Sequence, residues 1–414
     1  MTFPIDTVRA EFPALSSTAG GAGPTFLDNP GGTQVPRRVA DAVRDAMLEA
    51  ASNLGGLFTA SDRASEIWQS AHDEMASLFG AASPDEIIIG PSSTALVLHV
   101  SRSLGRTMAP GDEIIVTKMD HEGSISPWLL LAEDLGLTIK WLPFNRETWR
   151  IEPEDLAALL TDRTRLLALN VSSNLTGSIN DFQALTTLAK DAGALVYLDA
   201  VQYAPHRLLD VQSIGADFVT CSSYKYFGPH LGTLWGRAGL LGDLTGYKCR
   251  CTPNEAPVKF EPGTPQTELL AGLAETIRYL AWLGEQVGST GNQREKLTTA
   301  FKSFSEYEDA LTLRLIDGIS SLKGVTVHGI TNPNRIAERV PTVSFTHESV
   351  TPEEIAGKLG RKGINVWHGH NYAYEPARYL GIDEETGVLR VGIAHYNTMD
   401  EIEATLTAID EALS

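Results

Sequence analysis

The chain has 414 residues, 43% of them hydrophobic and 21% charged, which is enough for a large core and two domains. Its net charge of −19 argues against a nucleic-acid partner or an anionic membrane surface. No apolar stretch approaches the roughly 18 residues of a membrane span, and residues 1–6 lack a signal-peptide pattern. Three cysteines form no disulfide framework. We therefore expect a cytoplasmic protein.

Strand and helix patterns alternate through the first two thirds of the chain. A short strand runs into the turn at residues 29–32, and a helix begins near Pro36. Short apolar runs then recur between helical patterns, at residues 86–90, 113–116, 138–142, 166–171, 195–198, 218–221 and 232–235. Such a series predicts a mostly parallel sheet covered on both faces, with ligands bound beyond the carboxyl ends of its strands.

The remainder predicts a smaller α+β domain. A helix over 269–283 and a polar loop over 288–293 precede a helix over 307–322 and strands at 325–328, 342–345 and 363–367. Thr351 with Glu354, and Thr398 with Glu401, predict capping boxes at two further helices. We expect residues 1–35 to associate with the small domain, 36–285 to form the large cofactor-binding domain, and 286–414 to form the small domain.

Lys225 stands just after an apolar run at residues 217–220, among hydroxyls and aromatics and before a Gly-Pro break. A buried amine there would titrate low and could form a Schiff base, whereas a strand-end lysine in water is the plain alternative. Another apolar strand ends in Asp199. A lysine and an aspartate on neighbouring strand ends suit pyridoxal phosphate, whose aldehyde binds the lysine and whose pyridine nitrogen the aspartate keeps protonated.

Four further positions each have a functional and a structural interpretation. Ser93 and Thr94 at a strand–helix turn suit an anion, or simply cap the helix. His121 could stack on a flat ring or be exposed, and Asn174 could donate to a phenolate oxygen or shape a turn. Arg390 lies amid apolar residues and needs an anionic partner, either a substrate carboxylate or an internal acid.

Other chemistries find less support. His368 and His370 have no third metal ligand at a recognisable spacing, and Cys249 and Cys251 lack a second cysteine pair. We therefore expect no metal site. No Walker motif and no Gly-x-Gly-x-x-Gly are present, which disfavours nucleotide enzymes.

Taken together, these residues resemble the class V aminotransferase family of fold type I pyridoxal phosphate enzymes, in particular its cysteine-desulfurase-like branch. The resemblance covers almost the whole chain. Ser222 to Lys225 is similar to the family's Ser-x-His-Lys segment, with Tyr224 in place of the usual histidine. It implies an α/β fold with a mostly parallel seven-stranded sheet domain and a smaller α+β C-terminal domain.

The resemblance also implies roles for individual residues. Lys225 would be the Schiff-base lysine and catalytic base, and His121 would stack on the ring and take part in catalysis. The residues implied to bind pyridoxal 5'-phosphate are Ser93, Thr94, His121, Asn174, Asp199, Gln202, Ser222, Tyr224, Lys225 and Thr267. Those implied to bind the amino-acid substrate are Arg390, Asn29 and His370. Residues 263–267 are similar to a loop that, in the family, reaches the neighbouring subunit's phosphate, and the resemblance therefore implies a homodimer.

The chain departs from desulfurases in the segment that follows residues 363–366. In desulfurases this segment carries an arginine and then a mobile cysteine that accepts sulfur. Trp367 stands in place of the arginine, and no cysteine follows through Tyr372. Our leading hypothesis is C–S bond cleavage or β-elimination on a cysteine-like substrate. The alternatives are an aminotransferase, an isopenicillin-N-epimerase-like epimerase, or a non-catalytic sulfur-transfer scaffold, against which the retained Lys225 and Asp199 speak. Trp367 and Tyr372, with Tyr374, indicate a less polar pocket or simply core packing.

Overall fold

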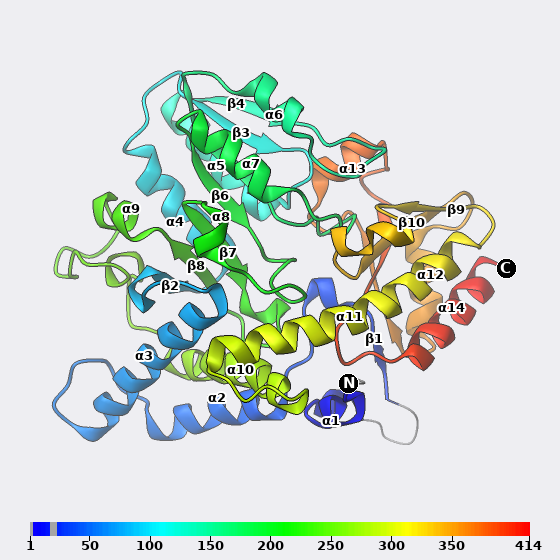
Figure 1. Ribbon diagram of the computed structural model, residues 1–414, viewed down its shortest axis with the longest axis horizontal. Helices are drawn as coiled ribbons and strands as arrows, with labels where there is room; N and C mark the ends of the chain where they lie inside the picture. The colour runs from blue at the N-terminus through cyan, green and yellow to red at the C-terminus, as the bar shows by residue number, and fades with distance from the viewer. Residues whose placement is uncertain (1–2, 17–22) are drawn as a thin grey trace.

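The computed structural model describes residues 3–16 and 23–414, and a seven-stranded sheet is its centre (Figure 1). The strands are β2 (Ile87–Gly90), β3 (Glu113–Thr117), β4 (Thr138–Leu142), β5 (Thr164–Asn170), β6 (Leu195–Asp199), β7 (Phe218–Ser222) and β8 (Gly232–Gly236). Their spatial order is β2-β8-β7-β6-β5-β3-β4. The pairs from β7 to β4 are parallel, whereas β8 is antiparallel to both neighbours. This confirms the expected mostly parallel sheet.

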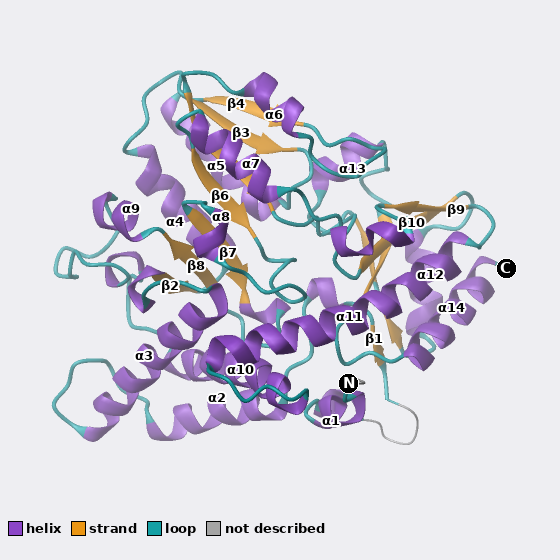
Figure 2. Cartoon of the chain, in the orientation of Figure 1, coloured by secondary structure: helices purple, strands orange, loops and turns teal. Residues whose placement is uncertain are grey.

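Helices bury both faces of this sheet (Figure 2), which is why its strands are apolar at consecutive positions. Ile87 and Ile89 share a core with α3 (Thr59–Phe79), α7 (Phe182–Asp191) and α10 (Thr267–Gln286). Ile88 points to the opposite core, with α4 (Ser93–Gly105) and α5 (Glu122–Leu135). The remaining helices around this sheet are α2 (Arg37–Glu49), α6 (Pro153–Leu159), α8 (Val211–Ile214) and α9 (Ala238–Asp243).

A second sheet of four antiparallel strands has the order β12-β13-β10-β9. Its strands are β9 (Val325–His328), β10 (Thr342–His347), β12 (Trp367–Gly369) and β13 (Val388–Gly392). It shares a separate core with α11 (Gln293–Ser320), α12 (Pro352–Gly360) and α14 (Met399–Leu413), and α13 (Tyr374–Leu380) joins β12 to β13. We call the parts built on the seven-stranded and four-stranded sheets the large and small domains. In the described part of the chain, no helix is long and apolar enough to cross a membrane.

The N-terminal segment, which includes α1 (Ile5–Ala10), joins the small domain through β1 (Thr25–Phe26). This strand pairs in parallel with β11 (Ile364–Asn365). The single strand predicted over 363–367 is therefore two strands, because residues 364–365 pair with β1 and residues 367–369 pair with β13. The domain limits predicted from the sequence stay a prediction.

Helix α11 is longer than the sequence analysis predicted, since it begins at Gln293 and not near Tyr307. Its first half is amphipathic, with Leu297 and Phe301 buried among charged neighbours. Asn292 starts it with a capping box, a feature that lies within the stretch predicted as a polar loop.

Both predicted capping boxes are confirmed, at Thr351 of α12 and at Thr398 of α14. Thr398 Oγ1 accepts from the Glu401 backbone N–H at 3.2 Å, and Glu401 Oε2 accepts from the Thr398 N–H at 3.0 Å.

Since Thr398→Ala removes one of these acceptors, we expect it to lower the free energy of unfolding by about 1 kcal/mol. Urea-induced unfolding measures this loss. Thr407→Ala in the same helix, where the hydroxyl is exposed, is the control, and equal losses in both variants would contradict the capping role.

Candidate active site

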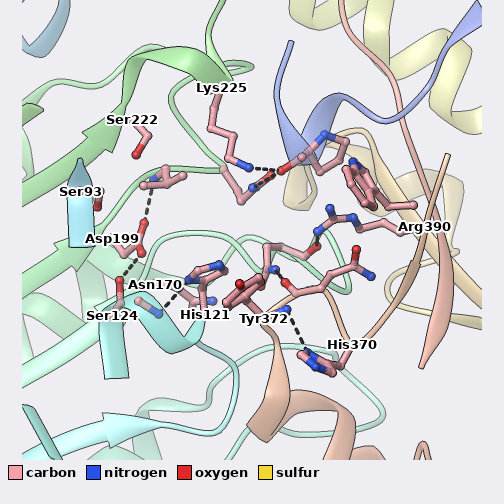
Figure 3. Close-up of a pocket in the computed structure, with 18 of the residues that line it drawn as sticks. Ser93, His121, Ser124, Asn170, Asp199, Ser222, Lys225, His370, Tyr372 and Arg390 are labelled. Atoms are coloured by element: carbon pink, nitrogen blue, oxygen red, sulfur yellow. Dashed lines mark hydrogen bonds between the residues drawn. The ribbon is translucent and has the colours of Figure 1, made fainter. Parts of the chain in front are cut away.

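A cavity of about 970 Å³ lies beyond the carboxyl ends of the central strands (Figure 3). Asn170, Asp199 and Ser222 are the last residues of β5, β6 and β7, and all three line it. The small domain supplies the other wall through the segment 367–372 and Arg390. The cavity is therefore where an open, mostly parallel sheet is expected to bind its ligand.

Lys225 reaches the cavity from the short 3₁₀ turn Ser223–Lys225 that follows β7. Its Nζ donates to the Pro30 carbonyl and lies 4.7 Å from the centre of the Tyr224 ring. Burial and, to a smaller extent, the charge of Arg390 lower the pKa of Lys225 to about 7, although the charge of Asp199 acts in the opposite direction. A large fraction of the amine is therefore uncharged and nucleophilic at neutral pH.

Asp199 is buried at the end of β6, with 8% of its surface exposed. One oxygen accepts from the Ser124 hydroxyl and the other from the Val201 N–H at 2.8 Å. Burial nevertheless raises the pKa of Asp199, against these hydrogen bonds and the charge of Lys225. A cation placed beside this carboxyl would stabilise its ionised form.

His121 caps α5, and its Nδ1 accepts from the Gly123 N–H at 2.9 Å. This hydrogen bond requires an unprotonated Nδ1, so the neutral ring carries its proton on Nε2. Burial lowers the pKa of His121 to about 4, and the charges of Lys225 and Arg390 contribute. The ring is therefore neutral at physiological pH and presents a flat face to a ligand.

Two helix N-termini meet at the cavity. Ser92 caps α4 by accepting from the Ala95 N–H at 3.1 Å, while Ser93 and Thr94 line the cavity. A β-carbon at Gly123 would lie 2.7 Å from Thr94 Oγ1, so only glycine lets the first turn of α5 approach so closely. The first N–H groups of α4 and the hydroxyls of Ser93 and Thr94 form a cradle suited to an anion such as phosphate.

Arg390 is 4% exposed, and its guanidinium donates to the Asn174 carbonyl at 3.0 Å. Within the described residues, Arg390 Nε, Asn174 Oδ1 and Ser172 Oγ are buried without a hydrogen-bond partner, and all three residues line the cavity. Burial lowers the pKa of Arg390 to about 10. Buried polar atoms normally have partners, so this wall suits a ligand that offers an acceptor to Arg390 Nε and a donor to Asn174 Oδ1.

Most of the residues that the sequence predicted for the site line this one cavity. They are Ser93, Thr94, His121, Asn174, Asp199, Gln202, Ser222, Tyr224, Lys225, His370 and Arg390. Gln202 Nε2 donates to the Pro30 carbonyl at 3.0 Å, and the Tyr224 ring stacks on His230.

Two predicted residues lie elsewhere. Both polar atoms of the Asn29 side chain have hydrogen-bond partners near the small domain. Its amide donates to the Gly392 carbonyl at 2.8 Å, and its oxygen accepts from the Tyr396 hydroxyl. It does not line the cavity of its own chain, and the prediction that it contacts substrate stays a prediction. Thr267 is buried at the start of α10 and also does not line the cavity.

The sequence analysis missed Ser124, Asn170 and Ser172, which all line the cavity. Asn170 ends an apolar strand just as Asp199 does, so its position in the sequence could have predicted that it lines the site. Ser124 had a weaker signal, because it lies in the helical turn that starts at His121. The aromatic pair Trp367 and Tyr372 does line the cavity, with both side chains largely exposed.

This sheet and site define an α/β enzyme that handles a flat, phosphorylated, amine-reactive group. The family model described as "Aminotransferase class-V" matches residues 25–405, and the chain belongs to that family. It is 34% identical to the "Aminotransferase-like protein FGM3" of Gibberella zeae, over 100% of this chain and 99% of that one. It is 30% identical to a cysteine desulfurase of Pectobacterium atrosepticum, over 99% of this chain and 98% of the relative.

Solved structures agree with these relationships. The cysteine desulfurase CsdA of Escherichia coli has a TM-score of 0.86 and 26% identity, over 100% of this chain and 99% of that one. The apo cysteine desulfurase of Thermococcus onnurineus has a TM-score of 0.87 and 26% identity, over 99% and 98% of the two chains. The fold is therefore that of fold type I pyridoxal phosphate enzymes, and the protein is a pyridoxal phosphate-dependent enzyme.

The cavity fits this cofactor. Asp199 needs a neighbouring cation, which a protonated pyridine nitrogen supplies, and the α4 cradle suits the phosphate. Lys225 offers a neutral amine, and His121 offers a flat neutral ring. When bound, the cofactor supplies an aldehyde for amines and a ring that accepts electrons from the substrate.

The lowered pKa of Lys225 predicts how the cofactor-free protein reacts with an amine-acylating reagent at different pH values. Because the neutral amine is present above a pH of about 7, we expect labelling of Lys225 to be half-maximal near neutrality. Exposed lysines of the same digest should react only as the pH approaches about 10. Peptide mass spectrometry measures both profiles.

Arg390→Gln should move the Lys225 profile to higher pH, because one charge that opposes protonation of the amine is removed. Arg314→Gln, at an exposed surface ion pair of the small domain, is the control and should leave the profile in place. A Lys225 profile that coincides with those of exposed lysines would contradict the assignment.

Proposed function

We propose that this enzyme cleaves the C–S bond of a cysteine-derived amino acid by β-elimination. The observation that supports this proposal is a cavity with a buried arginine and a low-pKa lysine but no thiol in its lining. Cys221 is buried, Cys249 and Cys251 are exposed, and none of the three lines the cavity. Sulfur that leaves the substrate would therefore depart as a free thiol and would not be accepted by a protein cysteine.

Each step has a residue placed for it. Arg390 would bind the substrate carboxylate, which would give its unpaired Nε an acceptor. The Lys225 amine would remove the α-proton, since its lowered pKa leaves it largely neutral. His121, with its proton on Nε2, would donate a hydrogen bond to the leaving sulfur, and the Lys225 ammonium formed by taking the α-proton would supply the proton. The net reaction converts an S-substituted cysteine and water into a thiol, pyruvate and ammonia.

Transamination and epimerisation use the same cofactor contacts and are the alternatives. The relative from Gibberella zeae is described as aminotransferase-like, which favours transamination as the second candidate. A non-catalytic sulfur-transfer scaffold would need neither the low-pKa Lys225 nor the buried Arg390.

Product analysis of the cofactor-loaded protein with cysteine and several S-substituted cysteines tests the proposal. We expect pyruvate, ammonia and the corresponding thiol in equal amounts. Alanine with protein-bound or released sulfur would establish a desulfurase, and a 2-oxo acid that retains the sulfur would establish a transaminase. Either result would contradict the proposed β-elimination. Recovery of the substrate with inverted configuration at Cα would also contradict it and would establish an epimerase.

Lys225→Ala should lower turnover by about 10²–10⁴-fold, because the general base is removed. Circular dichroism should show an unchanged fold, since Lys225 contacts only the cavity lining and the Pro30 carbonyl. Lys302→Ala, at an exposed position of α11, is the control and should retain full turnover. Full turnover by the Lys225 variant would exclude its role as the base.

We also propose that the enzyme is a homodimer that completes its sites across the subunit interface. Thr267 lies outside the cavity of its own chain, which is consistent with a contact to the phosphate of a second copy. Residues 263–266, just before it, line a separate cavity of about 500 Å³ together with Leu54. Light scattering should give twice the chain mass of 44.7 kDa. A monomer that still binds the cofactor tightly would exclude the shared site.

A further inference from the structure

The tip formed by Asn371 and Tyr372 has an unfavourable backbone conformation. It follows β12 and leads into α13, and its two φ angles are +54° and +58°. Left-handed backbone is disfavoured for residues with a β-carbon, and more for tyrosine than for asparagine. Two such residues in succession persist only where surrounding contacts hold them in place.

Two hydrogen bonds hold this tip against the large domain. Asn174 Nδ2 donates to the Asn371 carbonyl at 2.8 Å, and the Glu122 N–H donates to the Tyr372 carbonyl at 2.9 Å. The second donor belongs to the first turn of α5, where backbone N–H groups lack a helical acceptor. The tip therefore bridges the two domains across the cavity.

The Tyr372 side chain makes a third contact. Its ring stacks on His121, with centroids 5.5 Å apart and planes 20° apart (Figure 3). Tyr372 is 68% exposed, so burial in the core does not explain where its ring lies. His121 is fixed at the other side of its ring by the Gly123 N–H. The two contacts together define the plane of the histidine ring.

We propose that the Asn371–Tyr372 tip is an interdomain latch, in which Tyr372 is a positioning residue that fixes the ring plane of His121. Hydrogen bonds to the main-chain carbonyls of the tip hold it on the large domain, and the tyrosine ring contacts the histidine ring. The segment 367–372 is then a fixed wall of the cavity. The proposal rests on the proposed function only for the place of His121 beside the cofactor.

Hydrogen–deuterium exchange of the cofactor-free protein tests the latch directly. In Tyr372→Ala we expect the amides of residues 368–373 and 122–124 to exchange about three- to tenfold faster, because this is the effect of losing one aromatic pair. Tyr372→Phe keeps the stack and should exchange like the wild type. Tyr247→Ala, which removes an exposed ring beside His99 outside this cavity, is the matched control and should leave these amides unchanged.

Binding of pyridoxal phosphate gives a second measurement. A surface tyrosine with no effect on His121 would leave this binding unchanged. Tyr372→Ala should weaken pyridoxal phosphate binding by about three- to tenfold and shift the absorbance of the bound cofactor, with Tyr372→Phe restoring both. Wild-type exchange in Tyr372→Ala would overturn the latch, as would equally fast exchange in Tyr372→Phe. If no variant bound the cofactor, the proposed function would fail while the exchange result would still decide the latch.

Discussion

The cost of burying charge governs this site. Lys225, Arg390 and Asp199 share one cavity, and burial disfavours the charged form of each. Their mutual attraction offsets only part of that cost, because Lys225 and Arg390 repel each other and Asp199 is the one acid among these three buried groups. An anion beside Arg390 and a ring cation beside Asp199 would supply opposite charges to both groups. The proposed ligands would therefore lower the electrostatic cost of burying these side chains.

The fold makes this arrangement possible. Parallel strands end at one edge of a sheet, so polar residues after three separate apolar runs converge without any being adjacent in the chain. Asn170, Asp199 and Ser222 occupy those ends. The antiparallel β8 sits between β2 and β7 and brings the Ser92–Thr94 turn to the same edge as Ser222. The small domain then adds Arg390 from the middle of an antiparallel strand.

Much of this could be predicted from the sequence, because strand-end residues and helix starts leave local signals. Lys225 and Asp199 each follow an apolar run, and the low pKa expected of a buried lysine is present. Features set by long-range pairing could not be predicted in this way. Whether residues 363–367 form one strand or two depends on β1, more than 300 residues earlier in the chain. The hydrogen bonds of Asn29 could likewise not be predicted, since its partners Gly392 and Tyr396 lie at the other end of the sequence.

The position of Pro30 links the lysine to the architecture of the whole molecule. Its carbonyl accepts from both Lys225 and Gln202, yet the segment that carries it is fastened to the small domain by β1 and by Asn29. The acceptor that holds the resting amine therefore lies in a segment that is bonded to both domains. Any rotation of the small domain relative to the sheet would carry this acceptor away from the amine or toward it. The position of the small domain would in this way affect whether the Lys225 amine is hydrogen-bonded or free.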